Sequence, residues 1–169
     1  MRKISQALIS VSDKSNLKNL LKTLKRFNIK IISSGGTYTE IKKLGFKCRE
    51  VSDFTGFQEI LDGRVKTLHP KIHAGILNKR NNRSHKSQMK IANFENIDLV
   101  VVNFYPFEKT IKKTKDHKKI IENIDIGGPS LVRGAAKNYN DVTVLTNIDQ
   151  YELFTSELIK NNGSTSLDF

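Results

Sequence analysis

Short apolar segments that alternate with segments of helical periodicity are the feature that most constrains this fold. Apolar runs at 6–11, 29–33, 98–103 and 142–145 predict buried strands, and residues 46–51 form a further extended segment. Near-continuous apolar strands are typical of a sheet that is covered on both faces. Because these strands alternate with helices, the sequence predicts an α/β fold with a mainly parallel sheet and helices on both faces.

The helices are predicted from periodicity and from the residues at their ends. The clearest helix follows the first strand. Ser12 or Asp13 is its expected N-cap, and its apolar residues recur at helical spacing: Leu17, Leu20, Leu21, Leu24 and Phe27. A shorter helix ends at Gly45, and residues 52–83 lack clean periodicity. Further helices are expected at 84–94, 115–123, 130–138 and 149–160.

Composition bounds the class of protein. With 169 residues, 37% of them hydrophobic, the chain is long enough for one domain with a real core. No apolar run approaches the length of a membrane span, and the N-terminus is too polar for a secretory signal, so we expect a cytoplasmic protein. The single cysteine, Cys48, excludes an internal disulfide framework and a multi-cysteine metal site.

The formal net charge of +12 attracts anions such as nucleic acids, acidic membranes or phosphorylated metabolites. Six lysines gather between residues 109 and 119 with little aromatic interleaving, which favours a solvated face over a binding tract. We therefore assign a function only to those basic residues that lie inside a shaped site. Neither a nucleic acid nor a membrane is expected as a partner.

The first candidate site is a glycine-rich turn at 33–37 (Ser-Ser-Gly-Gly-Thr) between a strand and a helix. Glycines let the backbone approach a ligand closely, and free N–H groups at a helix start favour a phosphate. Ser34 and Thr37 add hydroxyl donors, and Lys14, at the end of the neighbouring strand, adds a full charge. Together with 10–14 (Ser-Val-Ser-Asp-Lys), the turn predicts a monophosphate site, although an ordinary strand-to-helix turn can have the same sequence.

Segment 62–75 packs three basic side chains, two histidines and two glycines into a stretch with neither helix nor strand period. If its backbone is extended, Arg64 and Lys66 lie on one side and can flank a polar planar ligand. No acidic or cysteine cluster completes a zinc site with the histidines. A structural histidine, hydrogen-bonded near Pro70, is therefore the better interpretation for either one.

The strongest strand ends in Asn103-Phe104-Tyr105-Pro106-Phe107. Pro106 restricts Tyr105 to an extended or turn conformation, which places the phenol at the rim where ligands bind. Phe104 and Phe107 are expected to pack into the core. Asn103 and Tyr105 are candidate site residues.

A second anion-binding turn is expected at 125–130 (Asp-Ile-Gly-Gly-Pro-Ser). The backbone N–H groups of residues 126–128 lie at a helix start, where they could stabilise developing negative charge. Asp125 is a candidate base or a helix N-cap, and the sequence leaves both open. Lys137 lies towards the helix end, where a lysine also suits the helix dipole, so its spacing alone assigns no function.

Taken together and in order, these motifs resemble a known enzyme family. The strings are Ser-Val-Ser-Asp-Lys (10–14), Ser-Gly-Gly-Thr (34–37), Gly-Arg-Val-Lys-Thr-Leu-His-Pro (63–70), His-Ala-Gly-Ile-Leu (73–77), Asn-Phe-Tyr-Pro-Phe (103–107), Ile-Asp-Ile-Gly-Gly (124–128) and Ala-Ala-Lys-Asn (135–138). They resemble the N-terminal half of the bifunctional purine enzymes that join AICAR formyltransferase to IMP cyclohydrolase. The resemblance covers essentially the whole chain.

The resemblance implies a methylglyoxal-synthase-like fold, with a Rossmann-like, mainly parallel sheet. It implies a hydrolase-class enzyme that converts the 5-formamido-imidazole-4-carboxamide ribotide (FAICAR) into IMP and water, the last step of de novo purine biosynthesis, without metal or organic cofactor. The family's catalytic positions match Lys66, Tyr105, Asp125 and Lys137. Its phosphate cradle and the positions near the base match Ser12, Lys14, Ser34, Gly35, Gly36, Thr37, Arg64, Thr67, Asn103, Ile126 and Gly127.

For the reaction we expect two groups of residues. Asp125, coupled to Lys137, would manage proton transfer at the carboxamide. Lys66, Tyr105 and the backbone N–H groups near Gly127 would stabilise the oxyanion.

The same resemblance predicts the domain organisation. Residues 1–163 are expected to form the cyclohydrolase domain, and residues 164–169 to begin the connection to a formyltransferase domain that is absent from this sequence. The expected ligand is a purine nucleotide, FAICAR or IMP, and the sequence leaves a homodimer open.

Three other functions remain as alternatives. Methylglyoxal synthase has a related fold and a similar phosphate turn, but it would not need the strings at 64–70 and 103–106. A nucleotide-sensing regulatory module would bind IMP without consuming FAICAR. A nucleic-acid-binding domain is favoured only by the net charge, and no DNA- or RNA-binding motif is recognised.

Overall fold

A parallel sheet of five strands forms the centre of the computed structural model, which describes residues 1–105 and 107–169. The strands are β2 (Gln6–Val11), β3 (Lys30–Ser33), β4 (Arg49–Glu50), β5 (Leu99–Asn103) and β6 (Thr143–Leu145). Their order is β4–β3–β2–β5–β6, so β2 lies in the middle. A separate antiparallel pair joins β1 (Arg2–Lys3) to β7 (Ser164–Thr165). The predicted α/β fold with a parallel sheet is confirmed.

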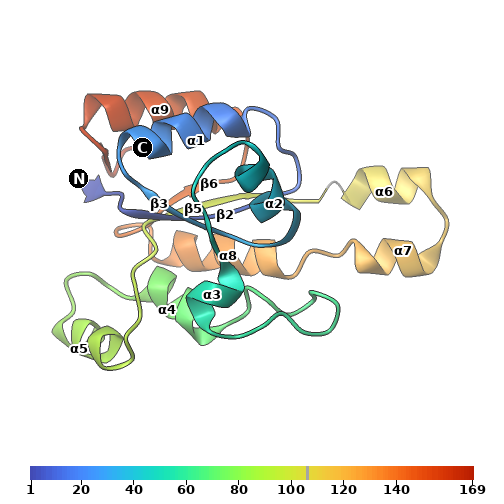
Figure 1. The fold of residues 1–169 in the computed structure, drawn as a ribbon, viewed down its shortest axis with the longest axis horizontal. Coiled ribbons are helices and arrows are strands. Elements are labelled where there is room, and N and C mark those ends of the chain that lie inside the picture. The colour runs from blue at the N-terminus through green and yellow to red at the C-terminus, as the bar shows by residue number, and fades with distance from the viewer. Residues whose placement is uncertain (106) are drawn as a thin grey trace.

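Helices cover both faces of the sheet (Figure 1). One face carries α1 (Leu17–Arg26), α2 (Gly35–Lys43) and α9 (Gln150–Lys160), and the other carries α3 (Val51–Thr55), α4 (Pro70–Leu77) and α8 (Gly127–Lys137). α5 (Arg83–Ile91) lies beyond α4. α6 (Phe107–Lys113) and α7 (His117–Glu122) form an arm that projects away from the sheet. None of the described helices is long and apolar enough to cross a membrane.

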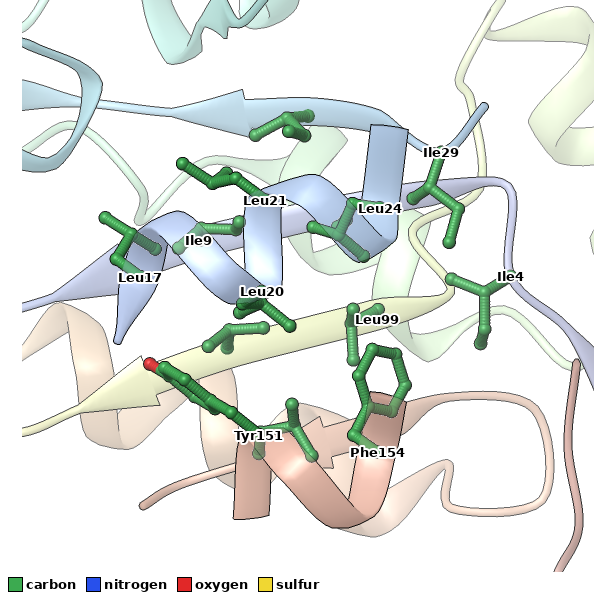
Figure 2. Close-up of a cluster of buried hydrophobic side chains, with 14 of the residues drawn as sticks. Ile4, Ile9, Leu17, Leu20, Leu21, Leu24, Ile29, Leu99, Tyr151 and Phe154 are labelled. Atoms are coloured by element: carbon green, nitrogen blue, oxygen red, sulfur yellow. The ribbon is translucent and has the colours of Figure 1, made fainter. Parts of the chain in front are cut away.

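Two apolar clusters form the core because successive strand residues point to opposite faces of the sheet. In β2, Ala7, Ile9 and Val11 belong to the cluster with α1 and α9, whereas Leu8 belongs to the cluster with α4 and α8. Figure 2 shows the first cluster, in which α1 and α9 both direct side chains such as Phe154 onto the strands. This burial on both faces explains why the strands are continuous apolar runs in the sequence.

Segment 46–51 is extended over a shorter length than the sequence predicts. Only Arg49 and Glu50 pair with β3, and the chain then turns directly into α3. The physical reason is burial, because Val51 and Phe54 both belong to the cluster on the α4 and α8 face.

Two helices begin at residues other than those predicted. The N-cap of α1 is Asn16, with a left-handed φ of 57°, rather than Ser12 or Asp13. The Asp13 Oδ1 atom instead accepts a hydrogen bond from the Ser15 N–H at 2.8 Å, in a turn before the helix. α8 begins at Gly127, three residues before the predicted start, which places its proline in the first turn where its missing N–H costs little.

The prediction that Phe104 and Phe107 pack into the core is wrong. Phe104 is 44% exposed and Phe107 is 38% exposed. Both follow the end of β5, beyond the two layers of helices, where the chain leaves the sheet for the arm. Pro106, on which the predicted restriction of Tyr105 depends, lies outside the described residues.

We predict opposite effects on stability for alanine at two helical glycines. A Cβ at Gly75 would lie 2.8 Å from the carbonyl oxygen of Glu95, so the variant should destabilise the fold by about 1–3 kcal/mol through overpacking. The matched control is Gly134, where a Cβ would make an ordinary contact of 3.5 Å with Ile76. Here the better helix propensity of alanine should leave stability unchanged or raise it by up to about 1 kcal/mol. Urea denaturation of both variants tests this pair, and equal effects would contradict it.

Candidate functional site

A cavity of about 670 Å³ opens at the carboxyl ends of the strands. Ligands bind at this edge of open parallel sheets, where the connections from neighbouring strands diverge. Every predicted site residue except Lys137 lines the cavity. The lining comes from five segments: 10–14, 34–37, 61–67, 103–105 and 121–128.

One end of the cavity is the N-terminus of α2, and two ammonium groups lie against it. Gly35 has a left-handed φ of 54°, and a Cβ there would lie 3.3 Å from Lys66 Nζ. A Cβ on Gly36 would lie 3.9 Å from Lys14 Nζ. Ser34, the N-cap, makes no side-chain hydrogen bond to the helix. The Lys14 ammonium and the positive end of the helix dipole suit a phosphate group. The Lys66 ammonium lies between this end and the loop 61–67, since a Cβ on Gly63 would also lie 3.3 Å from its Nζ.

The Thr37 hydroxyl connects α2 to the sheet rather than facing a ligand. It donates to the carbonyl oxygen of Val11 at 3.0 Å, and its oxygen accepts from the Val11 N–H at 3.1 Å. β3 pairs with β2 only as far as Ser33 opposite Ile9, so Thr37 replaces the strand residue that Val11 lacks. The prediction of a hydroxyl donor at this position is therefore wrong, although the Thr37 backbone remains in the first turn of α2.

Asn103 holds the loop between β2 and α1. Its Oδ1 atom accepts from the Asp13 N–H at 2.9 Å, and its Nδ2 donates to the Asp13 carbonyl oxygen at 2.8 Å. The backbone carbonyl of Asn103 also accepts from the Ser12 N–H at 3.4 Å. Asn103 thereby fixes the segment that carries Lys14 beside the start of α2.

Tyr151 is a supporting residue that the sequence reasoning missed. It belongs to α9, is 4% exposed, and hydrogen-bonds to the side chain of Asn103. Figure 2 shows its hydroxyl at the edge of the apolar cluster, away from the other labelled side chains. At a helical spacing from Phe154 and Leu158, it is indistinguishable in sequence from an ordinary core aromatic.

The loop 61–67 forms a tight turn on the cavity wall. Leu61 and Asp62 both have φ of 54°, and Gly63 follows with φ of 82°. Three consecutive left-handed residues are rare and costly for side chains other than glycine. An isolated antiparallel bridge between Ile60 and Val65 closes the turn.

Both cations of this loop contact carboxylates. Arg64 donates to both oxygens of Glu122, from Nη2 at 2.5 Å and from Nε at 3.3 Å. Lys66 Nζ lies 3.7 Å from Glu59 Oε2. Arg64 and Lys66 both line the cavity, although the backbone forms a tight turn and not the extended chain on which the predicted placement depended.

The other end of the cavity is the start of α8. The Gly128 N–H donates to Asp125 Oδ1 at 2.8 Å, so Asp125 acts as a cap of the helix as well as lining the cavity. A Cβ at Gly128 would collide with the Asp125 carboxylate, and one at Gly127 would lie 2.7 Å from Thr67 Oγ1. A side chain at either position would therefore have to displace Asp125 or Thr67, both of which line the cavity. Of the three N–H groups predicted to bind an anion, that of Gly128 is already used by Asp125, which leaves those of Ile126 and Gly127.

Lys137 and Tyr105 occupy very different places. Tyr105 lines the cavity and is 55% exposed, as expected for a residue at the rim. Lys137 is the last residue of α8, whereas Asp125 precedes the first. The 11 residues of this helix separate them by about 16 Å, so one chain does not form the expected coupling between Asp125 and Lys137.

The histidines near Pro70 have structural surroundings. His69 is the N-cap of α4, and its Nδ1 accepts from the Lys71 N–H at 3.1 Å, which confirms the structural interpretation for this residue. Burial lowers the pKa of His73 and so favours the neutral imidazole. Within the described ranges, no three histidine, cysteine or acidic side chains are grouped so as to hold a metal ion.

A larger cavity of about 940 Å³ opens at the amino ends of the strands. Its lining includes Arg80, whose guanidinium donates to three backbone carbonyls, among them that of Ile97 at 2.9 Å, and pairs with Asp98 at 3.5 Å. This arginine supports the fold. The smaller cavity, where glycines, cations and a carboxylate converge, is the better candidate site.

Comparison with known proteins agrees with this fold. The model of the MGS-like domain matches residues 16–130. The chain belongs to the family of MGS-like domains. A solved structure described as "Crystal structure of ForH" superimposes with a TM-score of 0.82 and 32% sequence identity, covering 95% of this chain and 82% of that chain.

Curated relatives carry the name "Bifunctional purine biosynthesis protein PurH". The protein of Bradyrhizobium diazoefficiens is 47% identical over 98% of this chain, and that of Acetivibrio thermocellus is 51% identical over 92%. The chain covers only 31% and 30% of their lengths, so it spans about a third of these relatives. The chain is thus homologous to part of a purine biosynthesis protein.

We predict that Tyr151 makes the fold sensitive to alkaline pH. Burial raises the pKa of its phenol to about 12, above the value of about 10 for an unfolded tyrosine. The folded state favours the neutral phenol, so this contribution to stability is complete below about pH 10 and is lost as the pH rises towards about 12. Between about pH 10 and about pH 12, the free energy of unfolding should therefore fall less for Tyr151→Phe than for the parent. Urea denaturation at several pH values measures both slopes, and identical slopes would contradict the assignment.

Proposed function

We propose that this chain is an IMP cyclohydrolase, which closes the second ring of FAICAR to give IMP and water. The observation that carries this proposal is one cavity with two chemically different ends, an anion site at the start of α2 and the Asp125 carboxylate at the start of α8. Tyr105 and Lys66 line the space that both ends share. The homology to purine biosynthesis proteins supports a purine nucleotide as the ligand.

The phosphate end orients the substrate. The 5′-phosphate would contact the N-terminal N–H groups of α2 and the Lys14 ammonium. Fixing this end places the imidazole and its two substituents towards Asp125. Because the carboxamide and the formamide belong to one molecule, the enzyme needs only to select their reactive conformation.

Ring closure begins when the carboxamide nitrogen attacks the formyl carbon. A C–N bond forms, the formyl C=O electron pair moves onto oxygen, and the nitrogen loses a proton to Asp125. The hydrogen bond from Gly128 leaves the second carboxylate oxygen of Asp125 available to accept that proton. Lys66, Tyr105 and the N–H groups of residues 126 and 127 would stabilise the oxyanion.

Dehydration completes the reaction. The oxyanion takes a proton and becomes a hydroxyl group, which leaves as water after a second protonation. The formamide nitrogen loses its proton to solvent as the ring C=N bond forms, and this proton balances the second one that the leaving oxygen takes up, so one water is released overall. Asp125, protonated in the first step, is a suitable donor, and this cycle needs no contribution from Lys137.

Alanine substitution of the two cavity lysines should affect different quantities, turnover for Lys66 and ligand binding for Lys14. Lys66→Ala should lower kcat for FAICAR by about 10²- to 10³-fold, as for loss of one oxyanion donor, and should change the Kd for IMP much less. Lys14→Ala should weaken IMP binding by about 10- to 100-fold through loss of a charged donor to the phosphate.

Lys18→Ala, on the exposed side of α1, is the matched control and should resemble the parent. Absorbance kinetics and calorimetry with IMP give both quantities, and dihydroxyacetone phosphate is the alternative substrate to exclude. A Lys66→Ala enzyme with near-normal turnover, or one impaired only in IMP binding, would contradict the role given to Lys66.

A further inference from the structure

Glu122 has no role in the proposed mechanism. Its described side-chain hydrogen bonds are both made with Arg64. It is the last residue of α7, in the arm, and its side chain lines the cavity three residues before Asp125. Arg64 lies on the opposite segment, in the strained turn at 61–67. The ion pair therefore joins the turn to the segment that leads into the start of α8.

The geometry of this pair leaves one edge of the guanidinium available. Glu122 accepts from Nε and Nη2, which is the side edge of the planar group. A guanidinium has five N–H donors, so the two donors of the end edge, one on Nη1 and one on Nη2, remain available, as does the second N–H of Nη1 on the opposite side. Such an edge can donate two parallel hydrogen bonds to one acceptor group in the plane.

The pair has little value as a support of the fold. Both side chains are 60% exposed, and exposed ion pairs contribute little to stability because water competes for each partner. Fixing a long side chain in one geometry does matter for binding, because an arginine that is already ordered loses less conformational entropy when a ligand arrives.

We propose that Glu122 is a positioning residue, which orients Arg64 so that its end edge donates to a carbonyl oxygen on the base of the bound nucleotide. This inference rests on the proposed function, since it assigns Arg64 to the base end of the same ligand. It adds a source of selectivity: Glu122 distinguishes a nucleotide that carries a base carbonyl from a bare sugar phosphate.

The test compares two ligands that share the phosphate. In the 1–169 protein, Glu122→Gln should raise the Kd for IMP and the KM for FAICAR by about 2- to 10-fold, the cost of ordering one long side chain. The Kd for ribose 5-phosphate and the value of kcat should stay within about twofold of the parent, as expected for a residue that acts on ligand binding alone. In an Arg64→Ala background, Glu122→Gln should have no further effect on IMP binding.

Asp116→Asn is the matched control, because it removes one negative charge from the same arm. Asp116 caps α7 by accepting from the N–H groups of Lys118 and Lys119, and asparagine can keep this role. This variant should bind IMP like the parent.

Four results would overturn the proposal: unchanged or tighter IMP binding in Glu122→Gln, an equal loss for ribose 5-phosphate, an equal effect of Asp116→Asn, or additivity with Arg64→Ala. Absence of FAICAR turnover in the parent protein would contradict the proposed function instead. The IMP and ribose 5-phosphate measurements would still decide the role of Glu122 in that case.

Discussion

The site depends on how the central strand β2 ends. β2 continues past the last residue of β3, and two side chains from neighbouring elements complete its hydrogen bonds. Thr37 takes both backbone groups of Val11, and Asn103 takes both backbone groups of Asp13. These four bonds dock α2 against β2 and fix the loop that carries Lys14. The phosphate end of the cavity thus depends on these two side chains, which continue the hydrogen bonding of β2 beyond the end of the sheet.

Each of the three cations of the cavity contacts an oxygen atom of the chain. Arg64 is bound by Glu122, Lys66 lies near Glu59, and Lys14 donates to the Ser12 carbonyl oxygen at 3.3 Å. The arm lysines whose side chains the structure describes are exposed to solvent. A net charge of +12 can raise the local concentration of any anion, but only fixed donors can select one. This contrast supports a small phosphorylated ligand over a nucleic acid.

The sequence predicts the sheet well, and it predicts turns that the structure brings to one cavity, because both follow from strong local signals. Buried runs such as 6–11 and 98–103 give the strands, and turns such as 33–37 then fall at one edge. The prediction fails where contacts between distant parts of the chain determine the local structure. The helix 51–55 is too short for a periodic pattern, and the cap at Asn16 depends on a turn formed by Asp13. Phe104 and Phe107 are apolar in sequence, but they lie where no layer covers them.

Other features of the site also depend on distances in the folded structure, which the spacing of residues along the sequence does not give. The hydroxyl of Thr37 and the phenol of Tyr151 serve the scaffold, although the first resembles a ligand donor and the second a core residue. Lys137, which only the resemblance assigns to the catalytic positions, lies a helix length from Asp125.

The proposed ring closure requires Asp125 to accept a proton from the carboxamide nitrogen. Turnover of FAICAR by Asp125→Asn, followed by absorbance, tests it most directly, because asparagine keeps an oxygen that can accept from the Gly128 N–H but is not a base. We predict normal folding and IMP binding with a turnover about 10²- to 10⁴-fold below that of the parent protein. Turnover within a few-fold of the parent would contradict the account.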